Sequence, residues 1–233
     1  MRRPHPEHLA PPLHLLLREG LSVVARLVGA VGRLRERGPA DGPPLMVIPG
    51  FLGSDRTTLP LQRELAREGY RVIGWGLGLN RGARADLLHA LVRNMEAHGR
   101  GRPVTLVGWS LGGVFAREVA KLRPELVARV VTMGSPFSGD PRANNAWRLY
   151  ERVAGHPVDR PPLDVTLGAK PPVHTLALWS RRDGMVAPAC ARGEAHERDD
   201  HRELACSHMA FATSRRAARE VARALREHGT EAA

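Results

Sequence analysis

One serine in this chain has the sequence context of a nucleophile. Ser110 lies in the sequence G-W-S-L-G at 108–112, directly after the apolar run 104–107 and at the start of the amphipathic run 111–122. A G-x-S-x-G sequence at a strand-to-helix turn holds its serine in a strained conformation, because small glycines let the two arms of the turn approach closely. The free N–H groups at the start of the helix point toward the same place. We therefore predict that Ser110 attacks its substrate covalently.

A serine hydroxyl needs a general base, and the base needs a group that orients it. In a strand–serine–helix arrangement, the order along the chain is serine, acid, histidine. Asp183 comes just beyond the apolar run 173–179 and precedes a glycine, so it stands at the end of an expected strand. His208 lies between a short apolar stretch and the last amphipathic run. These positions predict His208 as the general base and Asp183 as its orienting group.

Other acids and histidines after Ser110 are alternatives. The other histidines are less well placed, because one begins an expected strand and two lie in the charged run 194–203, which is typical of a solvated loop. They are His174, His196 and His201. The weaker acid candidates are Asp140, Asp159, Asp164, Asp199 and Asp200. Asp183 also has a second interpretation, since aspartate before glycine is common in turns.

Backbone donors must stabilise the oxyanion that forms when a serine attacks a carbonyl. The first expected donor is the N–H of Leu111, directly after the serine. The second is the N–H of Phe51, in the Pro-Gly-Phe loop that follows the first core strand. Substrate contacts are expected from residues beside these groups. They are Trp109, Asn80, Leu52 and Met185. For Asn80, an equally good interpretation is a helix cap.

The elements that must position these residues alternate along the chain. Apolar runs at 45–48, 71–75, 104–107, 127–133 and 173–179 are expected strands, and amphipathic runs at 59–68, 83–98, 111–122 and 213–228 are expected helices. Continuous apolar strands between helices predict an α/β fold with a mostly parallel central sheet covered by helices on both faces.

The Pro-rich stretch 135–172 interrupts this alternation and contains one short helical piece near 145–153. An insertion at the carboxyl ends of parallel strands lies over the ligand crevice. We therefore predict a small lid there, within a domain that spans 43–233.

Residues 1–42 are expected to form an N-terminal extension, with a basic amphipathic helix from about 13 to 37 and a Gly/Pro-rich linker. Its apolar residues recur at spacings of three and four, which places them on one face. They are Leu17, Leu21, Val24, Val28 and Val31. We favour packing of this face against the chain's own domain. The alternative is weak contact with a membrane surface.

The composition is that of a globular domain with an excess of arginine. The net charge of +11 would suit an acidic partner, but no recognition motif accompanies it, so we expect no nucleic-acid partner. The arginines of the last helix have the spacing of a solvated face, namely Arg215, Arg219, Arg223 and Arg226. No apolar stretch suits a signal peptide or a membrane span, which predicts a cytoplasmic protein. Nothing in the sequence indicates an oligomeric state.

The chain has two cysteines, Cys190 and Cys206. Two are too few for a disulfide framework, and free thiols are the expected state in a reducing compartment. One bridge between them is the alternative.

With these residues in hand, the chain resembles the α/β-hydrolase superfamily, and more narrowly its bacterial lipase and esterase-like members. The motifs that carry the resemblance lie within about 43–228. They are Pro49-Gly50-Phe51, G-W-S-L-G at 108–112, Gly134-Ser135-Pro136, Asp183-Gly184 and Ser207-His208. The resemblance implies the α/β-hydrolase fold and hydrolysis of small or lipid carboxylic esters through an acyl-serine, with no metal and no organic cofactor.

Two positions depart from the pattern of many such enzymes, which carry histidine where this chain has Pro49 and Trp109. Neither position supplies catalytic chemistry, and the short insertion favours an esterase of modest acyl substrates. The alternatives are an acyltransferase or a thioesterase that uses the same acyl-serine. A non-catalytic binding protein is less favoured, because all three positions of the expected triad are filled.

Overall fold

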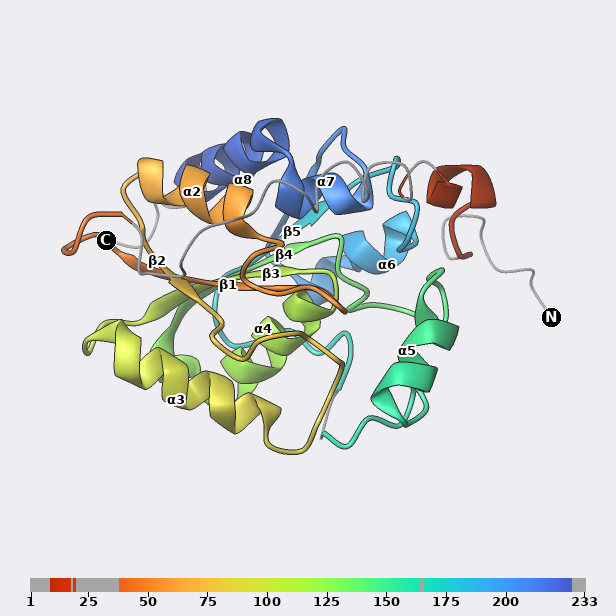
Figure 1. Cartoon of the computed structure of the whole chain (residues 1–233), viewed down its shortest axis with the longest axis horizontal. Coiled ribbons are helices and arrows are strands. Elements are labelled where there is room, and N and C mark those ends of the chain that lie inside the picture. The colour runs from red at the N-terminus through yellow and green to blue at the C-terminus, as the bar shows by residue number, and fades with distance from the viewer. Residues whose placement is uncertain (1–8, 18, 20–37, 164–165, 228–233) are drawn as a thin grey trace.

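The structure is a computed structural model and describes residues 9–17, 19, 38–163 and 166–227. In this part of the chain, six parallel strands form one sheet in the order β2-β1-β3-β4-β5-β6 (Figure 1). The strands are β1 (Pro44–Ile48), β2 (Arg71–Gly74), β3 (Val104–Trp109), β4 (Val127–Met133), β5 (Thr175–Trp179) and β6 (Asp200–Glu203). The expected parallel sheet is confirmed.

Helices cover both faces of the sheet (Figure 1). One face carries α2 (Leu59–Arg67), α7 (His208–Thr213) and α8 (Arg215–Glu227), and the other carries α3 (Leu87–Gly99) and α4 (Leu111–Leu122). In β1, Leu45 and Val47 belong to the first apolar cluster, whereas Met46 and Ile48 belong to the second. Successive side chains of a strand point to opposite faces, and both faces are covered, so the strand is apolar throughout.

The charged run 194–203 is not the loop that we expected. It contains a short 3-10 helix, η3 (Ala195–Glu197), and the edge strand β6, which pairs in parallel with β5. The side chains of β6 are partly or fully exposed, so no apolar run marks the strand in the sequence, and its backbone pairing with β5 holds it.

The last expected helix, 213–228, corresponds to α8, and the short helix α7 precedes it. α7 ends at Thr213, Ser214 has an extended backbone with φ −92° and ψ 127°, and α8 begins at Arg215. α7 was not expected from the sequence, and it begins at His208.

The insertion between β4 and β5 contains α5 (Trp147–Ala154). The remaining short elements are η2 (Pro124–Leu126) and α6 (Pro188–Arg192). α5 projects beyond the carboxyl ends of the strands (Figure 1).

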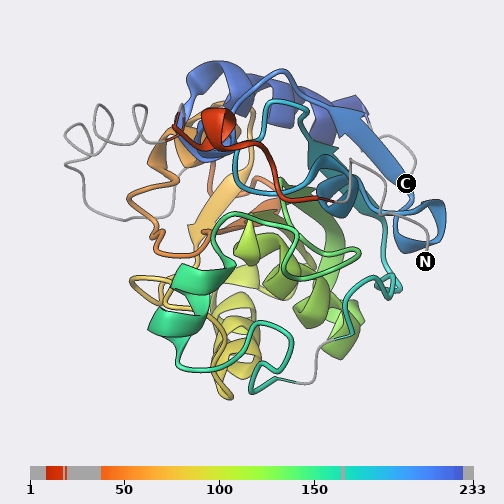
Figure 2. The ribbon, with the colours of Figure 1, turned by 90° about the vertical axis from the view of Figure 1, so that its right-hand side faces the viewer.

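Residues 9–17 and 19, here called the N-terminal segment, lie on the same side of the molecule as the carboxyl ends of the strands (Figure 2). Residues 13–17 and 19 are helical, in agreement with the start of the expected helix, whereas its remainder lies outside the described residues. Among the residues that the structure describes, no helix is both long and apolar enough to cross a bilayer.

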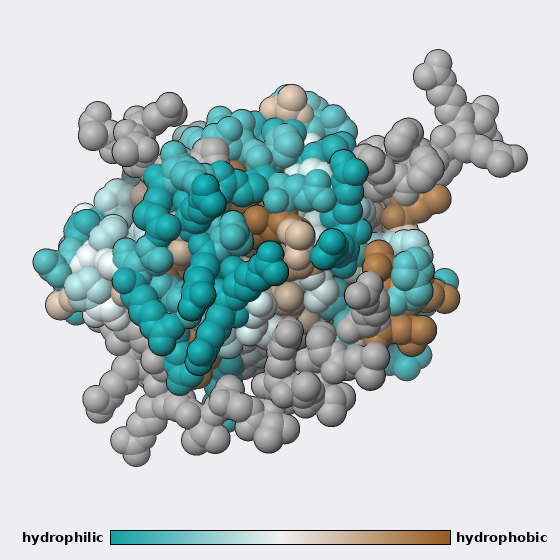
Figure 3. All heavy atoms as spheres, turned by 90° about the horizontal axis from the view of Figure 1, so that it is seen from above, coloured by the Kyte–Doolittle hydropathy of each residue, from teal (hydrophilic) through white to brown (hydrophobic). Residues whose placement is uncertain are grey.

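The surface over α2 and α8 is strongly hydrophilic (Figure 3). Several arginines of α8 have acidic partners: Arg223 pairs with Glu227, Arg226 with Glu68 and Arg219 with Glu64. Exposed pairs of this kind contribute little to stability, so the stripe is a solvated helix face, as its spacing predicted.

Both cysteines are free. Burial is the main reason that the pKa of the Cys190 thiol is raised to about 11 and that of Cys206 to about 12, with nearby carboxylates adding to it. Both are therefore neutral thiols at pH 7.

Candidate active site

The strand order reverses between β1 and β3. The chain passes from β1 to β2 on one side and then returns to form β3 on the other. Ligands of open parallel sheets bind in the crevice outside the strand ends at such a point. Phe51 follows β1 and Ser110 follows β3, so both loops meet there. The two loops approach each other closely: a Cβ on Gly50 would lie 2.9 Å from the Cβ of Ser110.

Ser110 occupies the strained turn that its neighbours predict. Its φ of 54° and ψ of −124° are rare for a residue with a side chain. The turn is possible because residue 108 is glycine. A Cβ at this position would lie only 2.4 Å from the carbonyl oxygen of Gly112. The Ser110 N–H donates to the carbonyl of Met133 at 2.8 Å, which fixes the turn to β4. The residue is partly exposed and lines a cavity.

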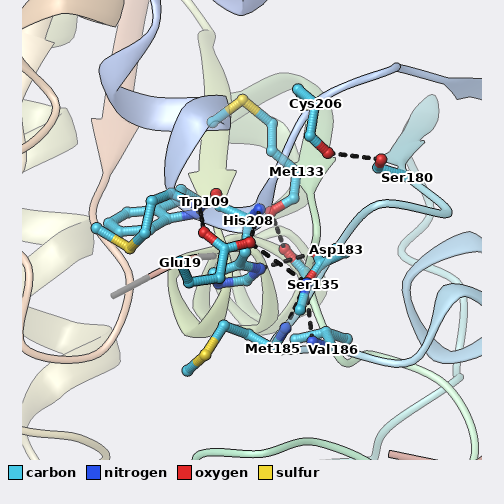
Figure 4. Close-up of polar contacts among 12 residues, drawn as sticks. Glu19, Trp109, Met133, Ser135, Ser180, Asp183, Met185, Val186, Cys206 and His208 are labelled. Carbon is cyan, nitrogen blue, oxygen red and sulfur yellow. Dashed lines mark hydrogen bonds and ion pairs between the residues drawn. The ribbon is translucent and has the colours of Figure 1, made fainter. Parts of the chain in front are cut away.

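His208 and Asp183 form a buried pair (Figure 4). His208 Nδ1 lies 2.8 Å from Asp183 Oδ2. The other carboxylate oxygen, Oδ1, accepts the N–H groups of Met185 at 2.8 Å and Val186 at 2.9 Å. An ionised carboxylate only accepts hydrogen bonds, so Nδ1 is the donor and the second ring nitrogen is left to act as a base. The two residues named from the sequence therefore do come together.

Charge and burial act in opposite directions on His208. Burial lowers the pKa of the imidazole, but the charge and hydrogen bond of Asp183 and the charge of Glu19 raise it, and the net pKa is above the ordinary 6.5. Trp109 packs beside the ring with a centroid distance of 5.6 Å, and its indole N–H donates to the His208 carbonyl at 3.1 Å. The surroundings of the His208 ring thus favour the imidazolium that forms when the ring accepts a proton.

The alternative residues have other partners. His174 Nε2 lies 3.2 Å from Asp200 Oδ2, and His201 Nδ1 accepts the indole N–H of Trp179. Asp199 is bonded to Thr175 at the start of β5, the opposite end from Asp183. Four candidates remain. His196 lies in η3, Asp140 accepts the N–H of Arg142 at 2.8 Å, Asp159 pairs with the Arg142 side chain, and Asp164 is outside the described residues.

A cavity of about 370 Å³ opens at Ser110. Its walls are mainly apolar, and much of them comes from the insertion after β4. The lining includes Phe51, Leu111, Val114, Pro136, Trp147, Tyr150, Leu163 and Met185. The insertion therefore supplies much of the wall of the cavity beside Ser110.

Of the four expected substrate contacts, Met185 lines the cavity, as do the two expected oxyanion donors, Phe51 and Leu111. Trp109, Asn80 and Leu52 are not among its lining residues. Trp109 instead supports His208, and Leu52 is 42% exposed with a φ of 56°.

Asn80 is a structural residue of the loop that carries Phe51. It is 1% exposed, its Nδ2 donates to the Pro49 carbonyl at 2.8 Å, and its Oδ1 accepts the Gly82 N–H at 3.1 Å. The cap-like interpretation is therefore closer to its observed contacts than substrate binding.

Asp55 holds the same loop and was not indicated by the sequence. It is 4% exposed and accepts the N–H groups of Trp75 at 2.9 Å and Gly76 at 3.1 Å, which ties the loop after β1 to the end of β2. Burial raises its pKa against the opposing effect of these two hydrogen bonds. Glu19 is the second residue that sequence reasoning missed, and it accepts the His208 N–H. Its partner is 189 positions away, so no local pattern could reveal it.

Gly134 provides a test of how tightly the pair formed by His208 and Asp183 is packed. Its φ is 54°, and a Cβ there would lie 2.8 Å from Asp183 Oδ2 and 3.2 Å from His208 Nδ1. We expect Gly134→Ala to lower kcat at least tenfold by displacing the pair. Gly155→Ala is the control, because Gly155 also has a positive φ but open space around it. Both variants carry about 1–2 kcal/mol of backbone strain, so equal kcat values would contradict the prediction.

Known proteins resemble the chain in sequence and in structure. A sequence model of the family described as "alpha/beta hydrolase fold" matches residues 43–159. A triacylglycerol lipase from Pseudarthrobacter phenanthrenivorans is 30% identical over 107 residues, which cover 41% of this chain. The same match covers 34% of that lipase, so the chain spans about a third of the length of this curated relative.

Two solved structures illustrate the structural likeness. A membrane phospholipase A, described as a bacterial virulence factor, superposes with a TM-score of 0.62 at 17% identity, covering 93% of this chain and 92% of the other. Naproxen esterase from Bacillus subtilis gives a TM-score of 0.57 at 15% identity, covering 83% of this chain and 86% of the other. At such identities the likeness is one of fold, and it confirms the fold expected from the sequence.

Proposed function

The chain belongs to the α/β-hydrolase family, and from this premise we propose that it hydrolyses carboxylic esters through an acyl-serine intermediate. Ser110 is the proposed nucleophile, His208 the general base, and Asp183 the group that orients it. The observation that carries the proposal is the buried pair of His208 Nδ1 and Asp183 Oδ2, 2.8 Å apart, at the strand ends where Ser110 lines the cavity.

The proposed reaction has two halves. Ser110 Oγ attacks the ester carbonyl while His208 Nε2 accepts the hydroxyl proton, and the oxyanion binds the N–H groups of Leu111 and Phe51. Leu111 is the first residue of α4, so its N–H has no acceptor within the helix. Collapse breaks the bond to the alcohol, which leaves with the proton from His208. Water then adds to the acyl-serine by the same route and releases the acid.

The cavity favours an uncharged, apolar acyl group of moderate size. Its volume of about 370 Å³ is near the lower end of the 300–1,000 Å³ common for small-molecule sites. The lining contains no Lys or Arg among the described residues, and its charged member is Asp159. An anionic substrate would find no partner in that wall, whereas an alkyl or aryl group would gain from removal of its surface from water.

A panel of p-nitrophenyl esters and acyl-thioesters with graded acyl chains tests the proposal. We expect hydrolysis of the esters, with kcat/KM rising with chain length until the cavity is filled and then falling. Absence of turnover on every member would contradict it. A clear preference for thioesters would favour a thioesterase, and transfer of the acyl group to an added alcohol in place of water would favour an acyltransferase.

One substitution should shift the chain-length preference. Ala146 precedes α5 and lines the cavity, so Ala146→Phe fills part of the volume available to the acyl group. We expect kcat/KM for the longest accepted ester to fall at least tenfold while the shortest ester is little affected. Leu149→Phe is the matched control, because Leu149 lies three residues further on, within α5, and its side chain is 50% exposed. Equal losses for short and long esters would show that Ala146 does not limit chain length.

A further inference from the structure

A second buried carboxylate, that of Glu19, lies beside the proposed acid–base pair (Figure 4). Glu19 comes from the N-terminal segment and is 3% exposed. Its Oε1 accepts the N–H of His208 at 2.6 Å and that of Gly184 at 3.3 Å, and its Oε2 accepts the N–H of Met209 at 3.0 Å. One side chain thus binds the backbone of His208 and also that of the residue next to Asp183.

These amides need an acceptor that the local sequence does not supply. α7 begins at His208, and the first N–H groups of a helix have no partner within it. The residue at the N-cap position, Ser207, makes no side-chain cap hydrogen bond. Glu19 meets this need from a distant part of the chain, and a carboxylate is the most favourable group for it because its hydrogen bonds are charge-assisted.

The N-terminal segment is fitted closely to this place. A Cβ on Gly184 would lie 2.6 Å from the carbonyl carbon of Leu15, so the segment can approach only because residue 184 is glycine. Asn145 adds a bridge: its Nδ2 donates to the Pro11 carbonyl at 2.9 Å and to the Gly184 carbonyl at 2.8 Å. Close packing at Gly184 and the hydrogen bonds of Asn145 therefore help to hold the N-terminal segment at the place where Glu19 binds the His208 backbone.

We propose that Glu19 is a positioning residue for the His208–Asp183 pair, and that the N-terminal segment contributes to the active site through this residue. The inference rests on the proposed function. Glu19 fixes the backbone on which both members of the pair are carried, and its negative charge stabilises the imidazolium form of His208.

In the part of the chain that the structure describes, two carboxylates act on the charge of His208, and a thiol and an aromatic ring lie near it. Asp183 and Glu19 are the two carboxylates. The Cys206 thiol stays neutral at working pH because burial raises its pKa to about 12. Trp109 contributes an uncharged ring. A change at Glu19 therefore removes one of the two negative charges that act on the imidazole.

Glu19→Gln removes that charge with little change in size. We expect kcat/KM to fall about 10- to 100-fold, as loss of hydrogen bonds to a charged group implies. The loss should fall on kcat, since Glu19 is not among the residues that line the cavity. Loss of a nearby negative charge lowers the pKa of His208, so the acid limb of the pH profile of kcat/KM should move to lower pH. Glu203→Gln, at an exposed position of β6, is the control.

Titration of the His208 ring by NMR measures the change in its pKa directly and needs no substrate. A lower pKa of His208 in Glu19→Gln supports the inference even if no ester is turned over, in which case only the proposed function fails. A wild-type enzyme that hydrolyses esters, together with unchanged kcat and unchanged His208 pKa in Glu19→Gln, overturns the inference alone. If that variant does not fold, Asn145→Ala replaces it. We expect a smaller fall in kcat from loosening of the segment, and a wild-type kcat would count against the inference.

Discussion

Ser110→Ala is expected to abolish ester turnover and labelling by a fluorophosphonate while the fold remains intact. The substitution removes the oxygen that would form the acyl-enzyme, and loss of the nucleophile in a serine hydrolase costs about 10⁶-fold in kcat. Alanine also has a Cβ, so the strained φ of 54° at this position is unchanged and the thermal unfolding temperature should move little.

A second serine supplies the control for this experiment. Ser214 lies between α7 and α8 and is not among the residues that line the cavity. The Ser214→Ala variant should therefore keep both turnover and labelling. Labelling that persists in Ser110→Ala would show that another residue is the nucleophile.

Asp183→Asn should lower kcat by about 10⁴-fold, the scale found when the orienting acid of a triad is replaced by its amide. The asparagine carbonyl can still accept the N–H groups of Met185 and Val186, as Asp183 Oδ1 does, so the loop is preserved. The amide NH2 then faces His208 Nδ1 and favours the opposite ring tautomer, which leaves Nε2 protonated and unable to accept the serine proton.

The pH dependence follows from the same pair. Activity needs a neutral imidazole, so kcat/KM of the wild-type protein should fall as the pH drops through the pKa of His208. Burial lowers that pKa, but Asp183 and Glu19 raise it to a net value above 6.5, which places the acid limb above pH 6.5. In Asp183→Asn the residual activity should show an acid limb at lower pH, because a negative charge has been removed.

Asp199→Asn is the matched control for this substitution. Asp199 bonds to Thr175 and Lys170 at the other end of β5 and should be dispensable for turnover. A near-normal kcat in Asp183→Asn, with a large loss in another aspartate variant, would assign the orienting role elsewhere.

The sequence by itself determined the features that arise from neighbouring residues. Gly108 and Gly112 allow the sharp turn at Ser110, and these small residues are visible at fixed spacing. The apolar runs predicted the buried parallel strands, because strands covered on both faces need apolar side chains at every position. The order of strands and helices also predicted that Asp183 and His208 follow Ser110 at the same edge of the sheet.

Only the tertiary structure decided what depends on contacts between distant segments. β6 is held by backbone pairing with β5, which leaves no apolar signal, and Asn80 is fixed by the Pro49 carbonyl rather than turned to a substrate. The size and walls of the cavity come from the insertion after β4. Glu19 reaches His208 across 189 positions, since folding brings together groups whose separation along the chain carries no pattern.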